Sequence, residues 1–180
     1  MMENKDEVAV FGGGCFWCTE AVFAELRGVT SVVPGYAGGQ VENPTYKQVC
    51  SETTGHAEVV RVQFDPDQIT YNDLLEVFFA THDPTTLNRQ GADRGTQYRS
   101  LILYADEDQK HQAEAFIRGL NGSGSTGSPI VTELAPLERF YEAEAEHQQF
   151  YLENPASMYC QVVINPKVAK VREKFARQLR

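Results

Sequence analysis

The hydrophobic and polar residues of the chain follow two periods, one typical of strands and one typical of helices. Short apolar runs bounded by turn residues predict strands, and apolar residues spaced three or four apart predict helices. Because the two kinds of segment alternate, the pattern predicts an α/β protein in which helices pack on a sheet. The expected strands cover residues 7–11, 29–33, 56–64, 101–104 and 130–134. The expected helices follow Cys15, cover residues 71–81, run from an Asp106 cap to about Leu120, and cover residues 138–151 and 166–180.

The connections between these elements are long and rich in turn residues. The second strand is expected to end at Pro34-Gly35, and residues 36–55 and 82–99 are expected to be loops. A further loop over residues 155–161 carries Cys160. Residues 121–128, rich in Gly and Ser, are interpreted as a surface loop. A length of 180 residues suits a single domain over residues 1–180.

The charge and hydrophobicity of the chain limit the classes of partner that we expect. The formal net charge is −9, from 25 acidic and 16 basic side chains, which opposes a phosphate-binding surface, so no nucleic acid partner is expected. No run approaches the roughly 18 apolar residues of a membrane span, so no membrane association is expected. Residues 1–7 are acidic and lack the apolar region of a signal peptide. A reducing, cytoplasmic location is therefore the expectation.

The four cysteines are the unusual item of the composition. They are too few for a disulfide scaffold. Cys15 is expected at the first turn of a helix, directly after a glycine run that permits a sharp turn. A helix N-terminus lowers the pKa of a thiol and favours the nucleophilic thiolate. Cys15 is therefore a candidate nucleophile, and the alternative is a small buried cysteine of structural value only.

Cys15 and Cys18 also form a Cys-x-x-Cys pair, which indicates redox chemistry or metal binding. A structural zinc site needs a second close pair of cysteines or histidines. Cys50 and Cys160 are single, and the four histidines have no such spacing, so no metal is expected. A thioredoxin-like fold is an alternative, since its reactive pair also opens a helix after a strand.

Glu58 is the second candidate. Residues of equal parity share one face of a strand, so Glu58 shares its face with Val60 and Val62. If that face lines the core, loss of hydration raises the pKa of the carboxyl and keeps it protonated near neutral pH, as a general acid requires. The alternative is that Glu58 begins the strand where the face is still exposed.

Two tyrosines in the expected loops, Tyr46 and Tyr98, can donate hydrogen bonds into a pocket. The alternative for each is packing of the ring with the hydroxyl in water.

Several motifs in one order, spanning about Val8 to Cys160, make the chain resemble peptide methionine sulfoxide reductase of the A type. They are Gly14-Cys15-Phe16-Trp17, Gly35-Tyr36-Ala37-Gly38-Gly39, Asn43-Pro44-Thr45-Tyr46, Thr54-Gly55-His56-Ala57-Glu58, His82-Asp83-Pro84, Gly95-Thr96-Gln97-Tyr98-Arg99-Ser100 and Glu146-His147-Gln148.

The resemblance implies thiol-dependent reduction of methionine S-sulfoxide, free or in proteins, and hence repair of oxidised proteins. It implies that Cys15 is the nucleophile and Glu58 the acid, and that Tyr46 and Tyr98 bind the sulfoxide oxygen. Asp93 would help to orient the substrate. It also implies that Phe16 and Trp17 form an apolar wall for the substrate methyl group.

The implied fold is a two-layer sandwich around a mixed sheet, with a ferredoxin-like core and long loops, and residues 1–180 would be one catalytic domain. No cofactor is expected, because electrons come from thioredoxin or another dithiol. A monomer is expected.

The chain departs from the common family pattern at its resolving cysteines. Many members have Gly where Cys18 stands, and many have two cysteines near the C-terminus, where this chain has only Cys160. Because Cys160 is expected in a loop of the segment 152–180, it is favoured as the thiol that condenses with the Cys15 sulfenic acid. Cys18 is the alternative resolving thiol, or a relay that takes over the disulfide. Cys50 is interpreted as a non-catalytic thiol.

Two rival functions are a thioredoxin-like reductase of protein disulfides and a non-enzymatic module that binds methionine-rich peptides. Consumption of a methyl sulfoxide in the presence of dithiothreitol separates all three.

Overall fold

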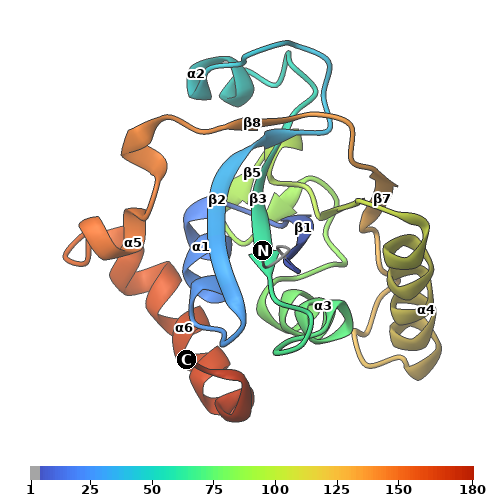
Figure 1. Cartoon of the computed structure of the whole chain (residues 1–180). Coiled ribbons are helices and arrows are strands. Elements are labelled where there is room, and N and C mark those ends of the chain that lie inside the picture. The colour runs from blue at the N-terminus through green and yellow to red at the C-terminus, as the bar shows by residue number, and fades with distance from the viewer. Residues whose placement is uncertain (1–4) are drawn as a thin grey trace.

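A mixed sheet of six strands with helices packed on it forms the fold (Figure 1). The computed structural model describes residues 5–180. Residues 1–4 belong to the segment that was not expected to be a signal peptide, and they lie outside the described residues. The strand order is β7-β6-β1-β3-β2-β8, in which β6 and β7 are parallel and all other neighbours are antiparallel. The strands are β1 (Glu7–Gly12), β2 (Val29–Ala37), β3 (Ala57–Phe64), β6 (Leu101–Tyr104), β7 (Glu133–Pro136) and β8 (Phe140–Glu142), and β4 (Arg89–Gln90) and β5 (Asp93–Arg94) make a separate pair.

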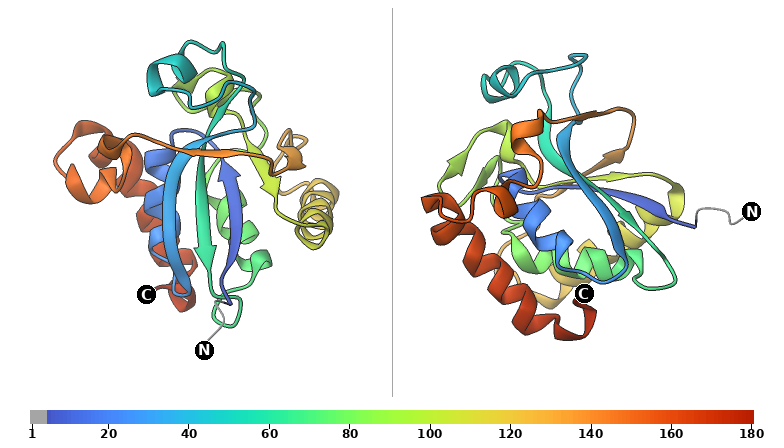
Figure 2. Two further views of the ribbon diagram at one scale, coloured as in Figure 1. Left: turned by 45° about the horizontal axis from the view of Figure 1, so that its top comes forward. Right: turned by 60° about the vertical axis from the view of Figure 1, so that its left-hand side comes forward.

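Helices α1, α3 and α6 pack against one another, and both views of Figure 2 show α6 running beside α1. Helix α2 stands apart, at the end of the sheet where β2 leads into the connection to β3. The α-helices are α1 (Phe16–Ala24), α2 (Tyr46–Cys50), α3 (Tyr71–Thr81), α4 (Glu107–Ser123), α5 (Phe150–Glu153) and α6 (Asn165–Lys174). The shorter turns are the 3-10 turns η1 (Thr96–Tyr98), η2 (Ala145–His147) and η4 (Ala176–Gln178) and the π-helical turn η3 (Cys160–Ile164).

The alternation of β3 divides its side chains between two apolar clusters. Val60 and Val62 face the helices and join the main core, whereas Ala57 and Val59 pack on the opposite face. Glu58 has the parity of the first group, and it is only 1% exposed. The interpretation of Glu58 as a buried carboxyl is therefore confirmed, and the alternative of an exposed strand end is wrong.

Periodicity located the elements best where a cap marks the helix start. Strand β6 and helix α3 have the predicted bounds. At the start of α3, Thr70 Oγ1 accepts a hydrogen bond from the Asp73 amide, and the Asp73 carboxylate accepts one from the Thr70 amide. Asp106 caps α4 in a similar way through the Gln109 amide. Helix α4 runs past the expected end, to Ser123, and stops at Gly124 in the left-handed conformation.

Strand β2 continues past Pro34-Gly35, to Ala37. The Pro34 carbonyl accepts a hydrogen bond from the Ala143 amide, so its missing N–H lies on the β8 side and costs the β2–β3 ladder nothing. Gly35 is needed because a Cβ there would lie 2.4 Å from the Tyr141 carbonyl oxygen and from the Phe140 ring. The turn residues thus admit the close approach of β8 instead of ending the strand.

The helix predicted over residues 138–151 is wrong. That segment holds β8, the turn η2 and only the start of α5. Its residues instead add an edge strand to β2, and Glu144 turns inward to accept hydrogen bonds from Tyr36 and Tyr46. The fifth predicted strand is also displaced, from residues 130–134 to β7, because the Val131 amide binds the Pro84 carbonyl outside the sheet.

The two long loops contain short elements. Residues 36–55 include α2, which begins at a capping box between Thr45 and Gln48. Residues 82–99 include β4, β5 and η1. These elements are too short to show a period.

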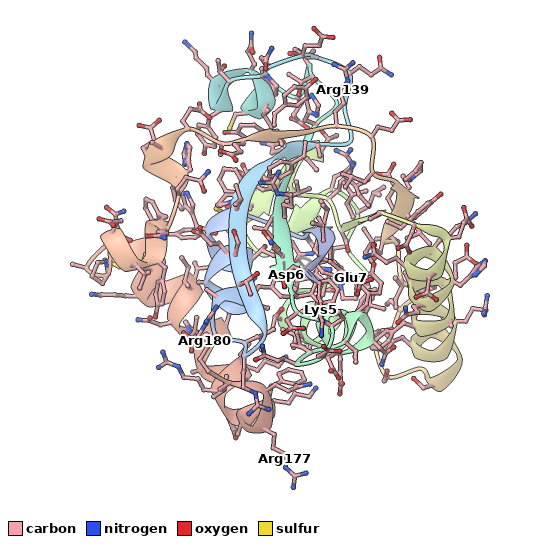
Figure 3. All side chains as sticks on the ribbon, in the orientation of Figure 1. Lys5, Asp6, Glu7, Arg139, Arg177 and Arg180 are labelled. Carbon is pink, nitrogen blue, oxygen red and sulfur yellow. The ribbon has the colours of Figure 1, made fainter. Side chains whose placement is uncertain are left out.

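Cys160 does not lie in a loop, which corrects the expectation for residues 155–161. Helical backbone begins before it, and Cys160 opens the π-helical turn that leads into α6. The helix expected over residues 166–180 ends as α6 at Lys174, and η4 follows. Arg180 binds the carbonyls of Ala24 and Val29 and lies against α1 and β2, whereas Arg177 points away (Figure 3).

Candidate active site

Cys15 is the N-cap of α1, at the point where the chain leaves β1. Gly14 has a φ of +85°, which L side chains rarely adopt, so the turn before the thiol requires glycine. The Gly14 amide donates a hydrogen bond of 3.1 Å to the Tyr98 carbonyl. This bond ties the turn in front of Cys15 to η1, which carries another of the predicted site residues.

Glu58 reaches the same helix start from β3. Its Oε1 accepts a hydrogen bond of 3.1 Å from the Phe16 amide, and its Oε2 is buried without a hydrogen-bond partner among the described residues. Burial raises the pKa of Glu58 to about 8; the Phe16 amide lowers it and the charge of Asp93 raises it. The carboxyl is therefore mostly protonated at neutral pH, with Oε2 available to carry the proton.

The pKa of the Cys15 thiol is raised well above its usual value, so the expectation of a thiolate favoured by the helix start is wrong. Burial is the largest cause, and the negative charges of Glu58 and Cys18, when ionised, add to it. Hydrogen bonds with the Trp17 amide and the Tyr159 hydroxyl act in the opposite direction but do not prevail. Loss of hydration outweighs the helix dipole here.

Tyr46, Tyr98 and Asp93 converge on the start of α1 from two long connections, residues 36–55 and 82–99. Tyr46 begins α2, Tyr98 ends η1 and Asp93 lies in β5. Burial raises the pKa of both phenols, and the charge of Glu58 raises both further. Both hydroxyls therefore remain hydrogen-bond donors throughout the ordinary pH range.

Tyr159 is a site residue that the sequence did not indicate. Its hydroxyl donates a 3.0 Å hydrogen bond to Asp93 Oδ2 and lies 3.5 Å from Cys18 Sγ. It thus connects Asp93 and Cys18, two residues that the sequence analysis considered separately. Its position immediately before Cys160 is the one sequence signal that could have found it.

Cys18 and Cys160 lie in one buried group, which we term the thiol cluster. Cys18 is 2% exposed and Cys160 is 0% exposed. Burial raises the pKa of the Cys18 thiol, the charge of Lys167 lowers it, and the Cys160 thiol is among the further groups that raise it. All four cysteines are free thiols in this structure. The cluster consists of Cys18, Ala21, Cys160, Ile164 and Val168.

Aromatic rings surround the start of α1. Trp17 stacks on Phe150 with ring centroids 3.6 Å apart, and its indole N–H donates a 3.1 Å hydrogen bond to His147 Nδ1. Phe16 is buried and packs its ring against those of Tyr36 and His147. Both residues expected to form an apolar wall therefore belong to one aromatic group beside Cys15.

Comparison with known proteins identifies the family. The family model described as peptide methionine sulfoxide reductase matches residues 7–179. The chain belongs to the peptide methionine sulfoxide reductase family. A protein of Haloquadratum walsbyi named peptide methionine sulfoxide reductase MsrA is 58% identical over 173 residues, which cover 96% of this chain and 98% of that protein.

Solved structures agree with this assignment. The reduced form of Mxr1 from Saccharomyces cerevisiae has a TM-score of 0.79 at 33% identity and covers 87% of this chain and 90% of that one. A crystal structure of Mxr1 in complex with Trx2 has a TM-score of 0.54 at 26% identity, with coverages of 83% and 89%. The chain is therefore an enzyme that reduces methionine sulfoxide.

Two more residues of the reductase contact the predicted site residues without having been given a role. Glu144 accepts hydrogen bonds from the Tyr36 hydroxyl, at 2.8 Å, and from the Tyr46 amide, at 2.9 Å. His147 contacts Trp17 as described above. His147 belongs to the motif Glu146-His147-Gln148. The residues that it contacts, such as Trp17 and Tyr46, lie about 100 to 130 residues away along the chain, so no local sequence pattern indicates the contacts.

Glu144, Glu146 and His147 bring three possible metal-ligand atoms within 4.8 Å of one another. This group does not fit a metal. Both Glu144 oxygens are occupied by donors, and His147 Nδ1 already uses its lone pair to accept the Trp17 N–H. A neutral imidazole has only one such lone pair, so Nε2 carries the proton and cannot bind an ion.

Within residues 5–180 of the reductase, no helix is both long and apolar enough to cross a bilayer.

Proposed function

We propose that Cys15 and Glu58 together reduce the S epimer of methionine sulfoxide, free or in proteins, and thereby repair oxidised proteins. The observation that carries this proposal is the buried carboxyl of Glu58, which the Phe16 amide holds beside the Cys15 thiol. A sulfoxide becomes a better electrophile as its oxygen gains a proton, and a buried carboxyl with a pKa of about 8 has that proton to give.

The chemical step balances within these two residues. Glu58 transfers its proton to the sulfoxide oxygen while the sulfur of Cys15 attacks the sulfoxide sulfur, and the proton of the Cys15 thiol passes to Glu58. The hydroxyl then moves from the substrate sulfur to the Cys15 sulfur, so the substrate S–O bond breaks, the substrate sulfur gains two electrons and the Cys15 sulfur loses them. The products are the thioether of methionine and a sulfenic acid on Cys15, which carries the oxygen. The raised pKa of the Cys15 thiol supports this exchange, because a neutral thiol has a proton to give back.

The surrounding residues hold the substrate. The hydroxyls of Tyr46 and Tyr98 would donate hydrogen bonds to the sulfoxide oxygen, and their raised pKa values support a donor role. Asp93, held by Tyr159, would orient the substrate backbone. The aromatic group of Phe16 and Trp17 would receive the methyl group.

We propose further that Cys18 condenses with the sulfenic acid first, and that Cys160 then takes over the disulfide. Cys15 is the N-cap of α1, and its carbonyl accepts a 3.1 Å hydrogen bond from the Cys18 amide, so the two residues close a single turn. Such a turn brings the Cα atoms of residues i and i+3 within about 7 Å of each other, and disulfides join Cα atoms about 4.4–6.8 Å apart. Cys160, in contrast, is buried in a helical turn beside Cys18. This order reverses the one expected from a mobile Cys160.

A dithiol protein such as thioredoxin would then regenerate the thiols, and no resident cofactor is needed. The existence of a solved complex between Mxr1 and Trx2 supports this partner. Regeneration by a reduced dithiol suits a cytoplasmic setting.

For the architecture, we propose one catalytic domain over residues 1–180, working as a monomer, in which the segment 152–180 carries the relay cysteine and the terminal helix. The unit β1-α1-β2-β3-α3-β6, with strand order β6-β1-β3-β2, supports a ferredoxin-like core in a two-layer sandwich.

The test of the chemistry is a single-turnover reaction with the separate S and R epimers of methionine sulfoxide. With one equivalent of sulfoxide per chain, the unchanged chain should convert the S epimer, Cys15→Ser should convert none, and Cys160→Ser should still convert it. Conversion by Cys15→Ser would refute the nucleophile, and equal conversion of the R epimer would refute the stereochemistry.

The order of disulfide transfer is tested by mass spectrometry after one turnover. Cys160→Ser should accumulate a Cys15–Cys18 disulfide, and the unchanged chain a Cys18–Cys160 disulfide. If Cys18→Ser instead forms a Cys15–Cys160 disulfide at the rate of the unchanged chain, Cys160 acts first.

A further inference from the structure

The connection between β8 and α5 lies against the aromatic residues of the candidate site. His147, at its centre, is 5% exposed. Its ring centroid lies 4.5 Å from that of Tyr46, 5.4 Å from that of Phe16 and 5.7 Å from that of Trp17. The His147 side chain thus contacts the ring of Tyr46, which is proposed to bind the sulfoxide oxygen. It also contacts the rings of Phe16 and Trp17, which are proposed to receive the methyl group.

The hydrogen bond from Trp17 fixes the state of this imidazole. An indole N–H can only donate, so His147 Nδ1 must be the acceptor and the ring proton lies on Nε2. Nε2 has no hydrogen-bond partner among the described residues, and the nearest oxygen of Glu146 lies 3.9 Å away. Within residues 5–180, the hydrogen bond from Trp17 is therefore the only one that this ring makes.

Bonds on both sides hold the backbone of His147 in place. Before it, Glu144 binds the Tyr36 hydroxyl and the Tyr46 amide. After it, the Gln148 side chain donates to the carbonyls of Pro34 and Ala143. The Gln149 amide then donates a 2.9 Å hydrogen bond to Glu20 Oε2, on the helix that begins at Cys15. A histidine so anchored can define where its aromatic neighbours stand.

We propose that His147 is a positioning residue that sets the width of the methyl pocket, by fixing the edge of the Trp17 indole while Phe150 stacks on its ring. The proposal rests on the proposed function, which gives that pocket to Trp17 and Phe16. When the acceptor at Nδ1 is lost, the indole has no polar partner to hold its edge, and the pocket widens enough to admit a larger alkyl group. His147 therefore determines preference for methyl over ethyl sulfoxides without touching the reacting atoms.

The test compares His147→Asn with His147→Leu. The two replacements have the same branched skeleton of four side-chain heavy atoms, but Asn Oδ1 can accept the Trp17 N–H from about the position of Nδ1, whereas Leu cannot. The assay is kcat/KM, with dithiothreitol as reductant, for methionine sulfoxide and for ethionine sulfoxide. A pocket discriminates one methylene by about 10–200-fold, and one hydrogen bond changes an equilibrium by about three- to tenfold.

We expect His147→Leu to lower the methyl-to-ethyl ratio of kcat/KM by about tenfold, mainly through a higher KM for the methyl substrate. His147→Asn should keep that ratio within about threefold of the unchanged chain. Glu146→Gln, in the same motif, is the matched control and should leave it unchanged. Fluorescence reports the cause, because Trp17 is the single tryptophan of the chain, and its emission should move to longer wavelength in His147→Leu only.

The proposal would be overturned if His147→Asn and His147→Leu had the same methyl-to-ethyl ratio of kcat/KM, whether that ratio was lowered in both or unchanged in both. If His147→Leu does not fold, His147→Phe carries the test, because it keeps an aromatic ring beside Trp17 but has no acceptor for the indole N–H and must lower the ratio likewise. Failure of the proposed function looks different, since the unchanged chain would then reduce neither sulfoxide in a reaction that depends on Cys15.

Discussion

Replacement of Glu58 by Gln makes a prediction about stability as well as about rate. Gln keeps the size and polarity of the side chain but cannot ionise and cannot donate a carboxyl proton. In the folded reductase the pKa of Glu58 is about 8, against an ordinary value of 4.5. A carboxyl whose pKa is raised by folding binds its proton more tightly in the folded chain than in the unfolded chain. The free energy of unfolding therefore falls as pH rises through that interval.

The size of the effect follows from the two pKa values. At about 1.36 kcal/mol per pKa unit, the full difference corresponds to about 4.8 kcal/mol, reached above pH 8. About 4 kcal/mol of it develops between pH 5 and pH 9. Because Glu58→Gln does not titrate, its free energy of unfolding relative to the unchanged chain should rise by about that amount over this range.

The assay is urea unfolding under reducing conditions at pH 5, 7 and 9, monitored by circular dichroism. Other groups that titrate in this range, such as Glu20 with a pKa of about 7, occur in both proteins and cancel in the difference. Glu42→Gln, at an exposed carboxyl, is the control and should show a difference near zero at every pH. A difference between Glu58→Gln and the unchanged chain that varies by less than about 1 kcal/mol would refute a buried, neutral Glu58.

Three further predictions address catalysis and fold. The single-turnover rate of the unchanged chain should fall as pH rises through about 8, because Glu58 then loses the proton that the sulfoxide oxygen needs, and a rate that is flat to pH 10 contradicts this role. Gly35→Ala should cost about 1–3 kcal/mol of unfolding free energy, because its Cβ would press on β8. Gly122→Ala, whose Cβ would meet no atom within 4 Å outside its own stretch of helix, should cost nothing, and equal costs would argue against the β2–β8 contact. Thr70→Ala should cost about 1 kcal/mol by removing the cap of α3, and the loss should be absent if the capping box does not form in solution.

The sequence predicted best the features that depend on neighbours along the chain. The period of β3 placed Glu58 with Val60 and Val62, and the structure buries all three on one face. Helix α3 combined a clear period with a cap at Thr70, and its bounds were predicted correctly. In such cases the residues that are apolar in the sequence pattern are the same residues that the fold buries.

The errors occurred where distant contacts override local preference. Glu144 and His147 lie in a segment that looks helical, but they form hydrogen bonds to Tyr46 and Trp17 far away along the chain. The pKa of the Cys15 thiol was predicted from its position at a helix start, yet burial among residues of other elements raises it. The periodicity of hydrophobic residues reflects only near neighbours along the chain, so it does not predict contacts between distant residues.

If Cys18 and Cys160 form the disulfide that is regenerated, as proposed above, their burial links regeneration to the motion of the C-terminal helix. A disulfide between these two residues would lie under Ile164 and Val168, where an external thiolate has no line of attack on either sulfur. The segment must open first, against the packing of Val168 and the remaining contacts of α6. The rate of reduction would be proportional to the fraction of molecules in that open state. Each additional ~1.4 kcal/mol of stability of the closed helix would therefore slow regeneration about tenfold. Amide hydrogen exchange in α6 would then track turnover, and an over-stabilised C-terminal helix would make a slower enzyme.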